Sequence, residues 1–294
     1  MGVRGRGEPK WFSGLISSDP ARTEARIQEL RAYMDANVLG PERFCCPHVR
    51  ECRGSIKKGH RFYEGILSHV GRHFDLSARG KPLRVVVVGQ ESGHKPTPVF
   101  KAEHVSLEER YRMIHDRTGI GRRYYAKPPH EARNPHMRGT TSALRVLFGK
   151  GLGREWESEF LLAADGLGFH IFDAFALVNV LLCSAHPPNS GVGASTELMR
   201  RNCLGHFQAT IRILEPTVLI LQGKGVQSWL IPAIDSEERL GPYVSRLTIA
   251  GKQMLATRFS HPAAYGALRW GDRLDAPYLV DVVEPTLRAL LDQL

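Results

Sequence analysis

The segment LRVVVVGQESGH, residues 83 to 94, joins a short apolar run to a polar end. Its four consecutive valines are too few for a helix of ordinary length and too apolar for a strand with one face in water. They therefore indicate a strand that is buried on both faces, as in parallel sheets. Gln90, Glu91 and His94 follow the end of this strand, and open α/β sheets bind ligands in the crevice at the carboxyl ends of their strands. The segment predicts an α/β fold with a site at that edge.

Further periodic segments predict the other elements. Apolar runs at residues 173–183 and 217–223 indicate two more buried strands, and residues 244–259 indicate a hairpin that closes the sheet. Amphipathic patterns with capping residues predict helices, among them a packing helix that follows Ser18-Asp19-Pro20. The other expected helices cover residues 60–76, 140–148, 155–164 and 196–214 and the carboxyl terminus. No linker divides the chain, so we expect one domain over residues 1–294, with residues 1–40 as a helical extension.

The net charge of +10, from 40 Lys and Arg against 30 Asp and Glu, favours a polyanionic partner. The excess is greatest from His94 to Lys150, where twelve basic residues accompany five acidic ones. Tyr124 and Tyr125 lie in this segment, and basic groups interleaved with aromatic ones suit phosphates and unstacked bases. A solvated charged loop is the alternative interpretation.

The amino terminus lacks the apolar run of a signal peptide, and no stretch reaches the ~18 apolar residues of a membrane span. We therefore expect a cytoplasmic protein without a membrane partner, and a monomer. Its five cysteines are then unlikely to form disulfides, and their clustering favours a metal site. They are Cys45, Cys46, Cys52, Cys183 and Cys203.

Three polar groups lie at or near the carboxyl ends of predicted strands: Glu91, Asn179 and His261. An acid, an amide and an imidazole at one sheet edge form an active-site pattern. From its position alone, Asn179 is either a satisfied core group or a reader of a ligand. The turn Gly223-Lys224-Gly225 lacks the GxxxxGK[ST] spacing of a phosphate-binding loop, which favours a tight turn over a nucleotide site.

In this order, these motifs resemble those of the uracil-DNA glycosylase superfamily. GQESGH at residues 89–94 resembles the first motif of that superfamily, of the GQDPYH, GEAPG or GMNPG kind. Asn179 resembles the Asn near the end of the second strand, and HPAA at residues 261–264 resembles the late HPSP motif. The resemblance covers roughly residues 40–270. It implies a three-layer α/β/α fold with a central parallel four-stranded sheet.

The cysteines are similar to those of the iron-sulfur branch, often called family 4. Two cysteines precede the first motif there, a third follows the Asn-bearing strand and a fourth lies in the next helix. The resemblance implies a [4Fe-4S] cluster on four of the five cysteines. Cys52, Cys183 and Cys203 are the firmer ligands, and Cys45 or Cys46 is the fourth. A four-cysteine zinc site and unliganded buried thiols are the alternatives.

The resemblance also implies roles for the polar groups. Loss of a base develops positive charge on the sugar and negative charge on the base, so the site needs a carboxylate or water near the anomeric carbon and a donor at the base oxygen. Glu91 and His261 fit those two roles. Gln90 positions the water if Glu91 is instead a structural carboxylate.

The base itself must leave the stack and be read in a pocket. By resemblance, Asn179 reads the N3 and O4 edge of uracil, and Gly89, which opens the first motif, belongs to the same base-binding group. His136, in the segment NPHMRG at residues 134–139, is the stacking candidate, and Arg138 of that segment is a DNA contact. Tyr265 and Arg269 either wedge into the duplex or simply pack.

We therefore expect a monofunctional DNA glycosylase that removes uracil from single- or double-stranded DNA and leaves an abasic site. The basic segment 95–133 is interpreted as an added DNA-contacting insertion. Two departures from the superfamily pattern, Glu91 in place of Asp, Asn or Ala and the missing aromatic after it, allow a looser specificity. The alternatives are a glycosylase for hypoxanthine or xanthine, a cluster-bearing DNA-binding protein without turnover, and a hydrolase that uses the Gly223-Lys224-Gly225 turn.

Overall fold

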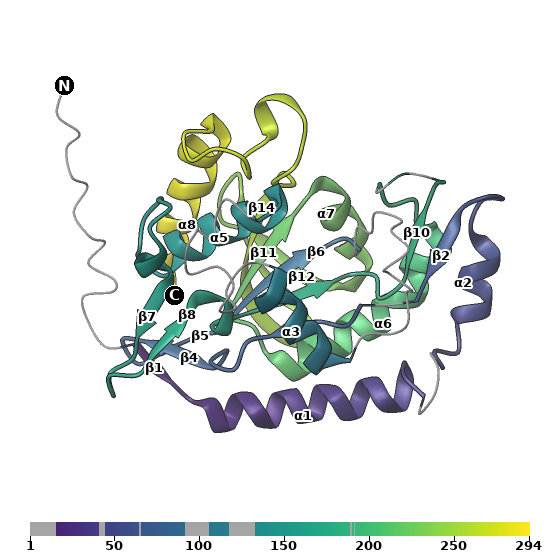
Figure 1. Ribbon diagram of the computed structural model, residues 1–294, viewed down its shortest axis with the longest axis horizontal. Helices are drawn as coiled ribbons and strands as arrows, with labels where there is room; N and C mark the ends of the chain where they lie inside the picture. The colour runs from purple at the N-terminus through teal and green to yellow at the C-terminus, as the bar shows by residue number, and fades with distance from the viewer. Residues whose placement is uncertain are drawn as a thin grey trace.

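The computed structural model describes residues 16–40, 45–64, 66–91, 106–117, 133–188, 190 and 192–294. Within these residues the chain has a mixed α/β fold (Figure 1). Its α-helices are α1 (Pro20–Asn37), α2 (Val49–Ser55), α3 (Leu107–Arg117), α5 (Pro135–Leu147), α6 (Glu197–Leu214), α7 (Lys224–Leu230) and α8 (Glu284–Leu291). None of the described helices is long and apolar enough to span a membrane.

The main sheet has seven described strands in the order β12-β13-β14-β11-β6-β9-β3. The central four, β14, β11, β6 and β9, are parallel, whereas β12, β13 and β3 pair antiparallel at the two sides. The sheet is therefore mixed and wider than the predicted set of four. The bounds are β3 (His69–Val70), β6 (Val85–Gly89), β9 (Phe175–Asn179), β11 (Val218–Gln222), β12 (Ile234–Arg239), β13 (Val244–Ile249) and β14 (Lys252–Phe259).

Shorter strands form small sheets around the main one. β1 (Ile16–Ser18) pairs with β4 (Leu76–Ala78), which also pairs with β5 (Lys81–Leu83). In the same way β2 (Arg61–Tyr63) pairs with β10 (Ser184–His186), and β7 (Phe160–Leu162) pairs with β8 (Gly168–His170). These antiparallel pairs join segments that the apolar pattern alone did not connect.

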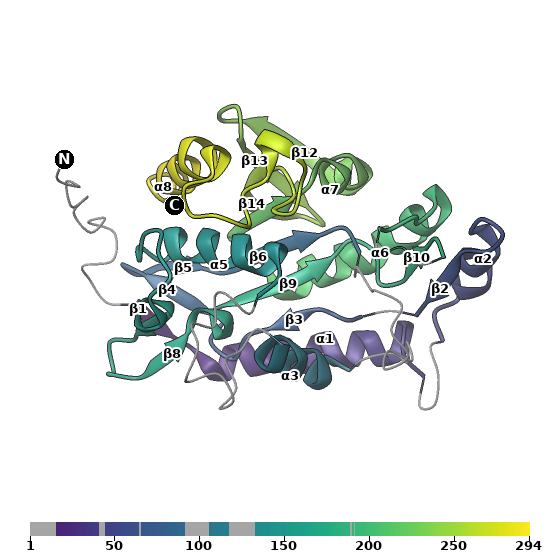
Figure 2. The ribbon, with the colours of Figure 1, turned by 45° about the horizontal axis from the view of Figure 1, so that its top comes forward.

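The prediction that the valine strand is buried on both faces is confirmed. Val86 and Val88 belong to one hydrophobic cluster, which includes residues of α1, α6 and α7. Val85 and Val87 belong to a second cluster, which includes residues of α5 and α8. Successive side chains of a strand point to opposite faces, so β6 contributes to both clusters. Figure 2 shows α5 and α8 on the other side of β6 from α1.

Capping residues set the starts of the helices that matter for the site. Asn134 accepts a hydrogen bond from the backbone N–H of Met137 at 2.9 Å, and Pro135 occupies the first turn of α5. The helix therefore begins several residues before the predicted start near residue 140, because an Asn cap followed by proline favours a helix there. As a result, His136 lies in the first turn of α5.

Two predicted helices are absent from the described residues. Residues 60–76 contain β2 and β3, and residues 155–164 contain a 3-10 turn, Trp156–Glu159, followed by β7. The predicted second strand also ends at Asn179 rather than at residue 183. β2 and β3 take their form from strand partners more than 100 positions away, and β7 forms a short hairpin with β8; local helical spacing reveals neither pairing.

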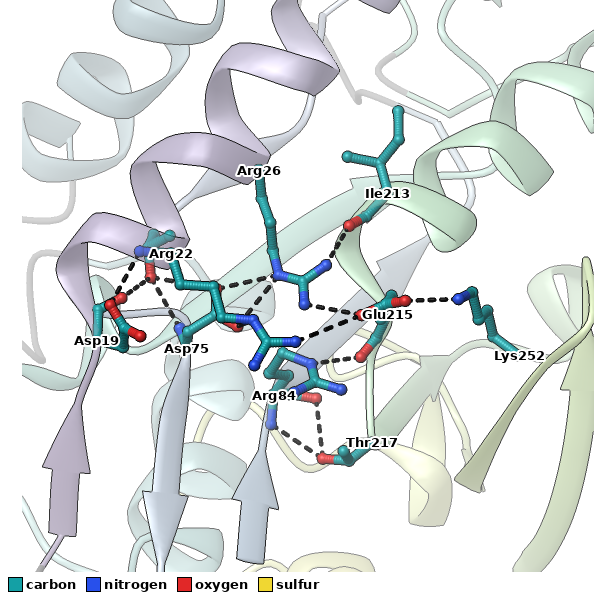
Figure 3. Close-up of polar contacts among 10 residues, drawn as sticks. Asp19, Arg22, Arg26, Asp75, Arg84, Ile213, Glu215, Thr217 and Lys252 are labelled. Carbon is teal, nitrogen blue, oxygen red and sulfur yellow. Dashed lines mark hydrogen bonds and ion pairs between the residues drawn. The ribbon is translucent and has the colours of Figure 1, made fainter.

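An ion network holds α1 to the edge of the sheet where the parallel strands begin (Figure 3). The guanidinium of Arg26 contacts Asp75 at 3.1 Å and Glu215 at 2.8 Å, and Lys252 contacts Glu215 at 2.5 Å. Hydrogen bonds from Lys252 and Arg26 lower the pKa of Glu215 to about 2. The network lies at the opposite end of the strands from Gln90 and Glu91, so it supports the fold and not the site.

Of the basic segment 95–133, the structure describes only residues 106–117 and 133. Tyr111 of α3 donates to Asp173 at 2.6 Å, and its ring stacks on His69 of β3 with centroids 5.6 Å apart. Arg31 of α1 forms an ion pair with Glu108. α3 therefore docks against β3 and α1. The remainder of the predicted insertion, with Tyr124 and Tyr125, lies outside the described residues.

Candidate active site

Asn179 and Gly89 face each other where β9 and β6 end. The two residues are register partners, and a Cβ added to Gly89 would lie 2.7 Å from Oδ1 of Asn179. The absence of that Cβ makes room for the amide. Asn179 is partly exposed, and its side chain makes no hydrogen bond to any residue that the structure describes. This environment favours a ligand reader over a satisfied core amide.

Glu91 lies in a cage of hydrogen-bond donors. Its carboxylate accepts from the Ser195 hydroxyl, from the backbone N–H of Ala185 at 3.4 Å and from the Gln90 amide at 3.2 Å. A Cβ at Gly193 would collide with Oε1 of Glu91. Burial raises the pKa of Glu91 above its ordinary value, although these hydrogen bonds oppose the rise. Glu91 thus fastens the 193–195 segment to the end of β6.

Gln90 points toward the neighbouring strand. A Cβ at Gly225 would lie 2.6 Å from Oε1 of Gln90, so the side-chain oxygen is directed at the start of α7. Its Nε2 donates to Glu91, which fixes the orientation of the amide. The acceptor oxygen of Gln90 therefore lies against Gly225, at the start of α7. Residues 92–94 of the first motif lie outside the described residues.

His261 follows β14 and stacks on His136 of α5. Their ring centroids are 5.3 Å apart and the ring planes differ by 19°. The Nδ1 of His261 accepts a hydrogen bond from the backbone N–H of Ala263 at 3.1 Å. In the neutral ring the proton is then on Nε2, which is left as a donor. The structure therefore unites two predicted site residues that are 125 positions apart in the sequence.

Close packing holds this pair of rings in place. A Cβ at Gly139 would lie 2.6 Å from Cβ of Pro262, so α5 approaches the 261–264 turn closely. The buried indole of Trp270 donates to the carbonyl of Ser260 at 2.8 Å. These contacts fix the backbone on both sides of His261.

Both imidazoles are held neutral. Burial, with smaller effects from the charges of His261 and Arg110, lowers the pKa of His136 to about 3. Partial desolvation also lowers the pKa of His261, although its side chain is exposed at the surface. At neutral pH, His261 is thus an uncharged hydrogen-bond donor. The effect on His136 also shows that Arg110 of α3 is near the site.

The Gly223-Lys224-Gly225 turn lies between Gln90 and His261. Gly223 has φ +121°, which favours glycine, and a Cβ there would be 3.8 Å from Cβ of His261. Gly225 leaves room for Gln90 in the same way. The turn thus brings the end of β11 between the ends of β6 and β14, and the glycines serve close packing. Lys224 itself is exposed.

The predicted DNA contacts lie at the rim. The side chain of Tyr265 is 89% exposed, which does not agree with a packing role. Arg269 forms an ion pair with Asp272, and Arg138 is partly buried on α5. Tyr265 and Arg269 therefore stand on the segment that follows His261.

Four of the five cysteines lie together in the first hydrophobic cluster. Cys46, Cys52, Cys183 and Cys203 are all buried, whereas Cys45 is exposed. Burial raises the pKa of Cys203 to about 12, and the nearby thiols of Cys52 and Cys46 add to this effect. The pKa of Cys183 is raised by burial and then by Cys203, Cys46 and Cys52. Burial therefore groups Cys46, and not Cys45, with Cys52, Cys183 and Cys203.

These thiols do not converge on one point. Among the described residues, no group of three or more His, Cys, Asp or Glu side chains is arranged to hold a single metal ion. A four-iron cluster takes one thiolate at each of four separate irons, whereas zinc draws all four thiolates onto one ion.

Sequence reasoning missed several residues around the site. Ser195, Gly193 and Gly225 contact the first motif but belong to segments more than 100 positions away. Ser195 has no sequence signal. The Gly223-Lys224-Gly225 turn was noticed, and only its place at the end of a strand could have linked it to the site.

Comparison with models of known protein families finds no match for this chain, and comparison with curated proteins finds none either.

Proposed function

We propose that this chain is a monofunctional DNA glycosylase that removes uracil and leaves an abasic site. The observation that carries the proposal is the meeting of Gln90, Asn179 and His261 at the carboxyl ends of three parallel strands. Support also comes from the fold. The two hydrophobic clusters on opposite faces of β6 agree with the layered α/β/α architecture that we propose for the chain.

Departure of the base is assisted by His261. As the glycosidic bond breaks, negative charge develops on the uracil oxygen, and a positioned donor there stabilises the transition state. The Nε2–H of His261 has this role because Nδ1 is occupied by the backbone of Ala263. His136 supports the ring from one face and holds its orientation.

Selection of the base is assigned to Asn179. An amide donates to O4 of uracil and accepts from N3–H at the same time, a pattern that the edge of cytosine does not match. Neither the amide oxygen nor the amide nitrogen of Asn179 forms a hydrogen bond with another described residue. Its contact with Gly89 fixes how deep the base enters.

The attacking water is positioned by Gln90, with Glu91 in support. The oxygen of the Gln90 amide lies beside Gly225 and accepts no hydrogen bond from a described residue, while the carboxylate of Glu91 is occupied by three donors. Glu91 then acts by orienting Gln90 and the 193–195 segment. Tyr265, Arg269 and Arg138 contact the DNA from which the base has been flipped.

We further propose a [4Fe-4S] cluster held by Cys46, Cys52, Cys183 and Cys203. Four buried thiols with raised pKa values lie in one apolar cluster, and a polynuclear cation would stabilise them as thiolates. The cluster would tie α2 and α6 to the residues that follow β9. Purified protein is expected to be brown and to contain about four irons per chain; a colourless preparation with one bound zinc would contradict this assignment.

The experiment that tests the function is excision of uracil from end-labelled single-stranded and duplex oligonucleotides, followed by alkali to cleave abasic sites. We expect excision by the wild type, a loss of at least ~100-fold in His261→Ala, and a similar loss in Gln90→Ala. Glu91→Gln should keep more activity than Glu91→Ala, because its amide oxygen can still accept hydrogen bonds from Ser195 and Ala185. Lys224→Ala, in the adjacent turn, is the matched control.

Two results would overturn the proposal. Excision of hypoxanthine or xanthine alone would move the substrate to another deaminated base. Tight binding of uracil-containing DNA without any excision would indicate a binding protein, for which His261→Ala has no rate to lower.

A further inference from the structure

Helix α6 carries Cys203, one of the four buried thiols, and two polar residues, Asn202 and His206, that lie near others of the four. Cys203 is flanked by Asn202, and His206 lies one helical turn beyond Asn202. α6 packs against both α1 and α2, and α2 carries Cys52. One helix thus supplies a thiol of the group together with two side chains that contact other thiols of the group.

Asn202 and His206 each lie within hydrogen-bond distance of a different sulfur. Nδ2 of Asn202 donates to Sγ of Cys52 at 3.6 Å, and it also reaches Glu51 at 3.3 Å. Nε2 of His206 is 3.5 Å from Sγ of Cys46, and its Nδ1 is 2.9 Å from the hydroxyl of Tyr33. His206 therefore bridges a tyrosine of α1 and a thiol of the group.

The direction of these hydrogen bonds depends on the state of the sulfur. A thiol can donate to Nε2 of His206, but a metal-bound thiolate has no proton to give. Nε2 must then carry the proton and donate it to Cys46. Nδ1 accepts in turn from Tyr33, whose hydroxyl can rotate to donate. Metal binding thus fixes one tautomer, and both ends of the imidazole are satisfied in it.

We propose that Asn202 and His206 are positioning residues that donate hydrogen bonds to the Cys52 and Cys46 thiolates and raise the reduction potential of the bound cluster. The inference rests on the cluster assigned above under the proposed function. A reduced cluster carries one more negative charge than an oxidised one, so N–H donors to its sulfurs stabilise the reduced form more. Because Tyr33 fixes the tautomer, it strengthens the donation from His206.

A surface pocket of about 320 Å³ opens beside this bridge. It is lined by Tyr33, Cys45, His48, Asn202 and His206, among others. Small reductants and oxidants can therefore approach the Cys46 side of the group closely. The exposed thiol of Cys45 faces the pocket and is not part of the bridge.

The test is a redox titration of the purified iron-loaded protein, followed by optical and electron paramagnetic resonance spectra. His206→Gln and His206→Asn form a matched pair. The Gln amide can replace Nε2 and still donate to Cys46, whereas the shorter Asn replaces only Nδ1. We expect a more negative potential in His206→Asn and Asn202→Leu, a smaller shift in Tyr33→Phe and nearly the wild-type potential in His206→Gln.

His48→Gln is the control, because the His48 imidazole lines the same pocket and contacts Glu51, while the hydrogen bond from His48 to Cys46 comes from its backbone, which the substitution keeps. Equal potentials and spectra in wild type, Tyr33→Phe and both His206 variants at equal iron content would overturn the inference. Absence of iron from the wild type would overturn it together with the cluster. The proposed glycosylase activity is tested separately, by uracil excision with the His261 and Gln90 variants, so neither of these results would decide it. If His206→Asn does not bind iron, the reduction potentials of Tyr33→Phe and His206→Gln, compared with that of the wild type, still test the inference.

Discussion

At the level of single residues, three glycines shape the candidate site by what they lack. Gly89 makes room for Asn179, Gly193 for Glu91 and Gly225 for Gln90. Each polar side chain is thus held by a close approach that any Cβ would prevent. Side chains in catalysis must be placed within a fraction of an ångström, so these glycines belong to the site as much as the polar groups do.

Gly89→Ala is expected to impair excision while the fold remains intact. The new Cβ would lie 2.7 Å from Oδ1 of Asn179 and force the amide to move. We expect a loss of at least ~10-fold in kcat/KM, since small misplacements in a site cost up to about 100-fold. Gly168→Ala is the control, because a Cβ there meets nothing within 4 Å. An unchanged rate would mean that Asn179 does not read the base.

His69 provides a test of stability against pH. It is fully buried, and burial lowers its pKa from 6.5 to about 3. The native state keeps the ring neutral, whereas the unfolded chain binds a proton below pH ~6.5. The contribution of the neutral His69 ring to the free energy of unfolding is therefore complete above that pH and is lost as the pH falls toward 3. His69→Gln should remove about 1.4 kcal/mol per pH unit from the acid slope in urea unfolding between pH 6 and 4. An equal slope in wild type and variant would contradict this, and His48→Gln is the exposed control.

At the level of elements, a buried ion network fixes the start of α5. Arg133 donates to both oxygens of Glu159, at 2.9 and 2.6 Å, and His170 contacts Glu159 at 2.8 Å. Burial alone would raise the pKa of Glu159, but hydrogen bonds from His170 and Arg133 lower it to about 2. The network joins the residue before the Asn134 cap to β7 and β8, and so helps to set the position of His136.

Glu159→Ala is therefore expected to destabilise the protein by about 3–5 kcal/mol, because it removes the carboxylate that accepts two hydrogen bonds from the buried guanidinium of Arg133. The double variant Glu159→Ala, Arg133→Met should recover much of that loss in urea unfolding. Glu197→Ala, which removes an exposed ion pair with Arg200, is the control, with an expected effect below about 0.5 kcal/mol. A double variant no more stable than Glu159→Ala would show that the charge of Arg133 is not the cause.

At the level of the whole molecule, opposite ends of the parallel strands have different tasks. The Arg26, Asp75 and Glu215 network ties α1 to the end where the strands begin (Figure 3). The candidate site occupies the end where they finish. α3 docks beside β3 and brings Arg110 near His136. Together with the net charge of +10, this arrangement suits an extended anionic ligand that crosses the carboxyl edge.

Affinity for DNA should accordingly fall steeply with salt. Each phosphate contact adds about 0.9 to the slope of log affinity against log salt concentration. Arg269→Ala should lower the slope by about 1, measured by fluorescence anisotropy with a uracil-containing duplex, whereas Arg246→Ala on β13 should leave it unchanged. An affinity that does not depend on salt would remove DNA phosphates as the partner.

The sequence by itself determined the central strands, the helices after Asp19 and Thr196, and the edge at which polar residues gather. These features depend on local information: apolar runs, capping residues and the rule that parallel strands end at one edge. His261 was also named from its position after a predicted strand, whereas His136 was named only through a family resemblance. Their stacking against each other was not predicted.

Only the tertiary structure decided what depends on contacts between distant segments. Residues 60–76 became strands because β10 and β9, more than 100 positions away, offered strand partners. Burial separated Cys46 from its exposed neighbour Cys45, although the two are adjacent in the chain. Two of the three donors to Glu91, Ala185 and Ser195, come from a segment that no local spacing connects to β6. Such choices depend on which surfaces meet after folding, and a pattern along the chain does not contain that information.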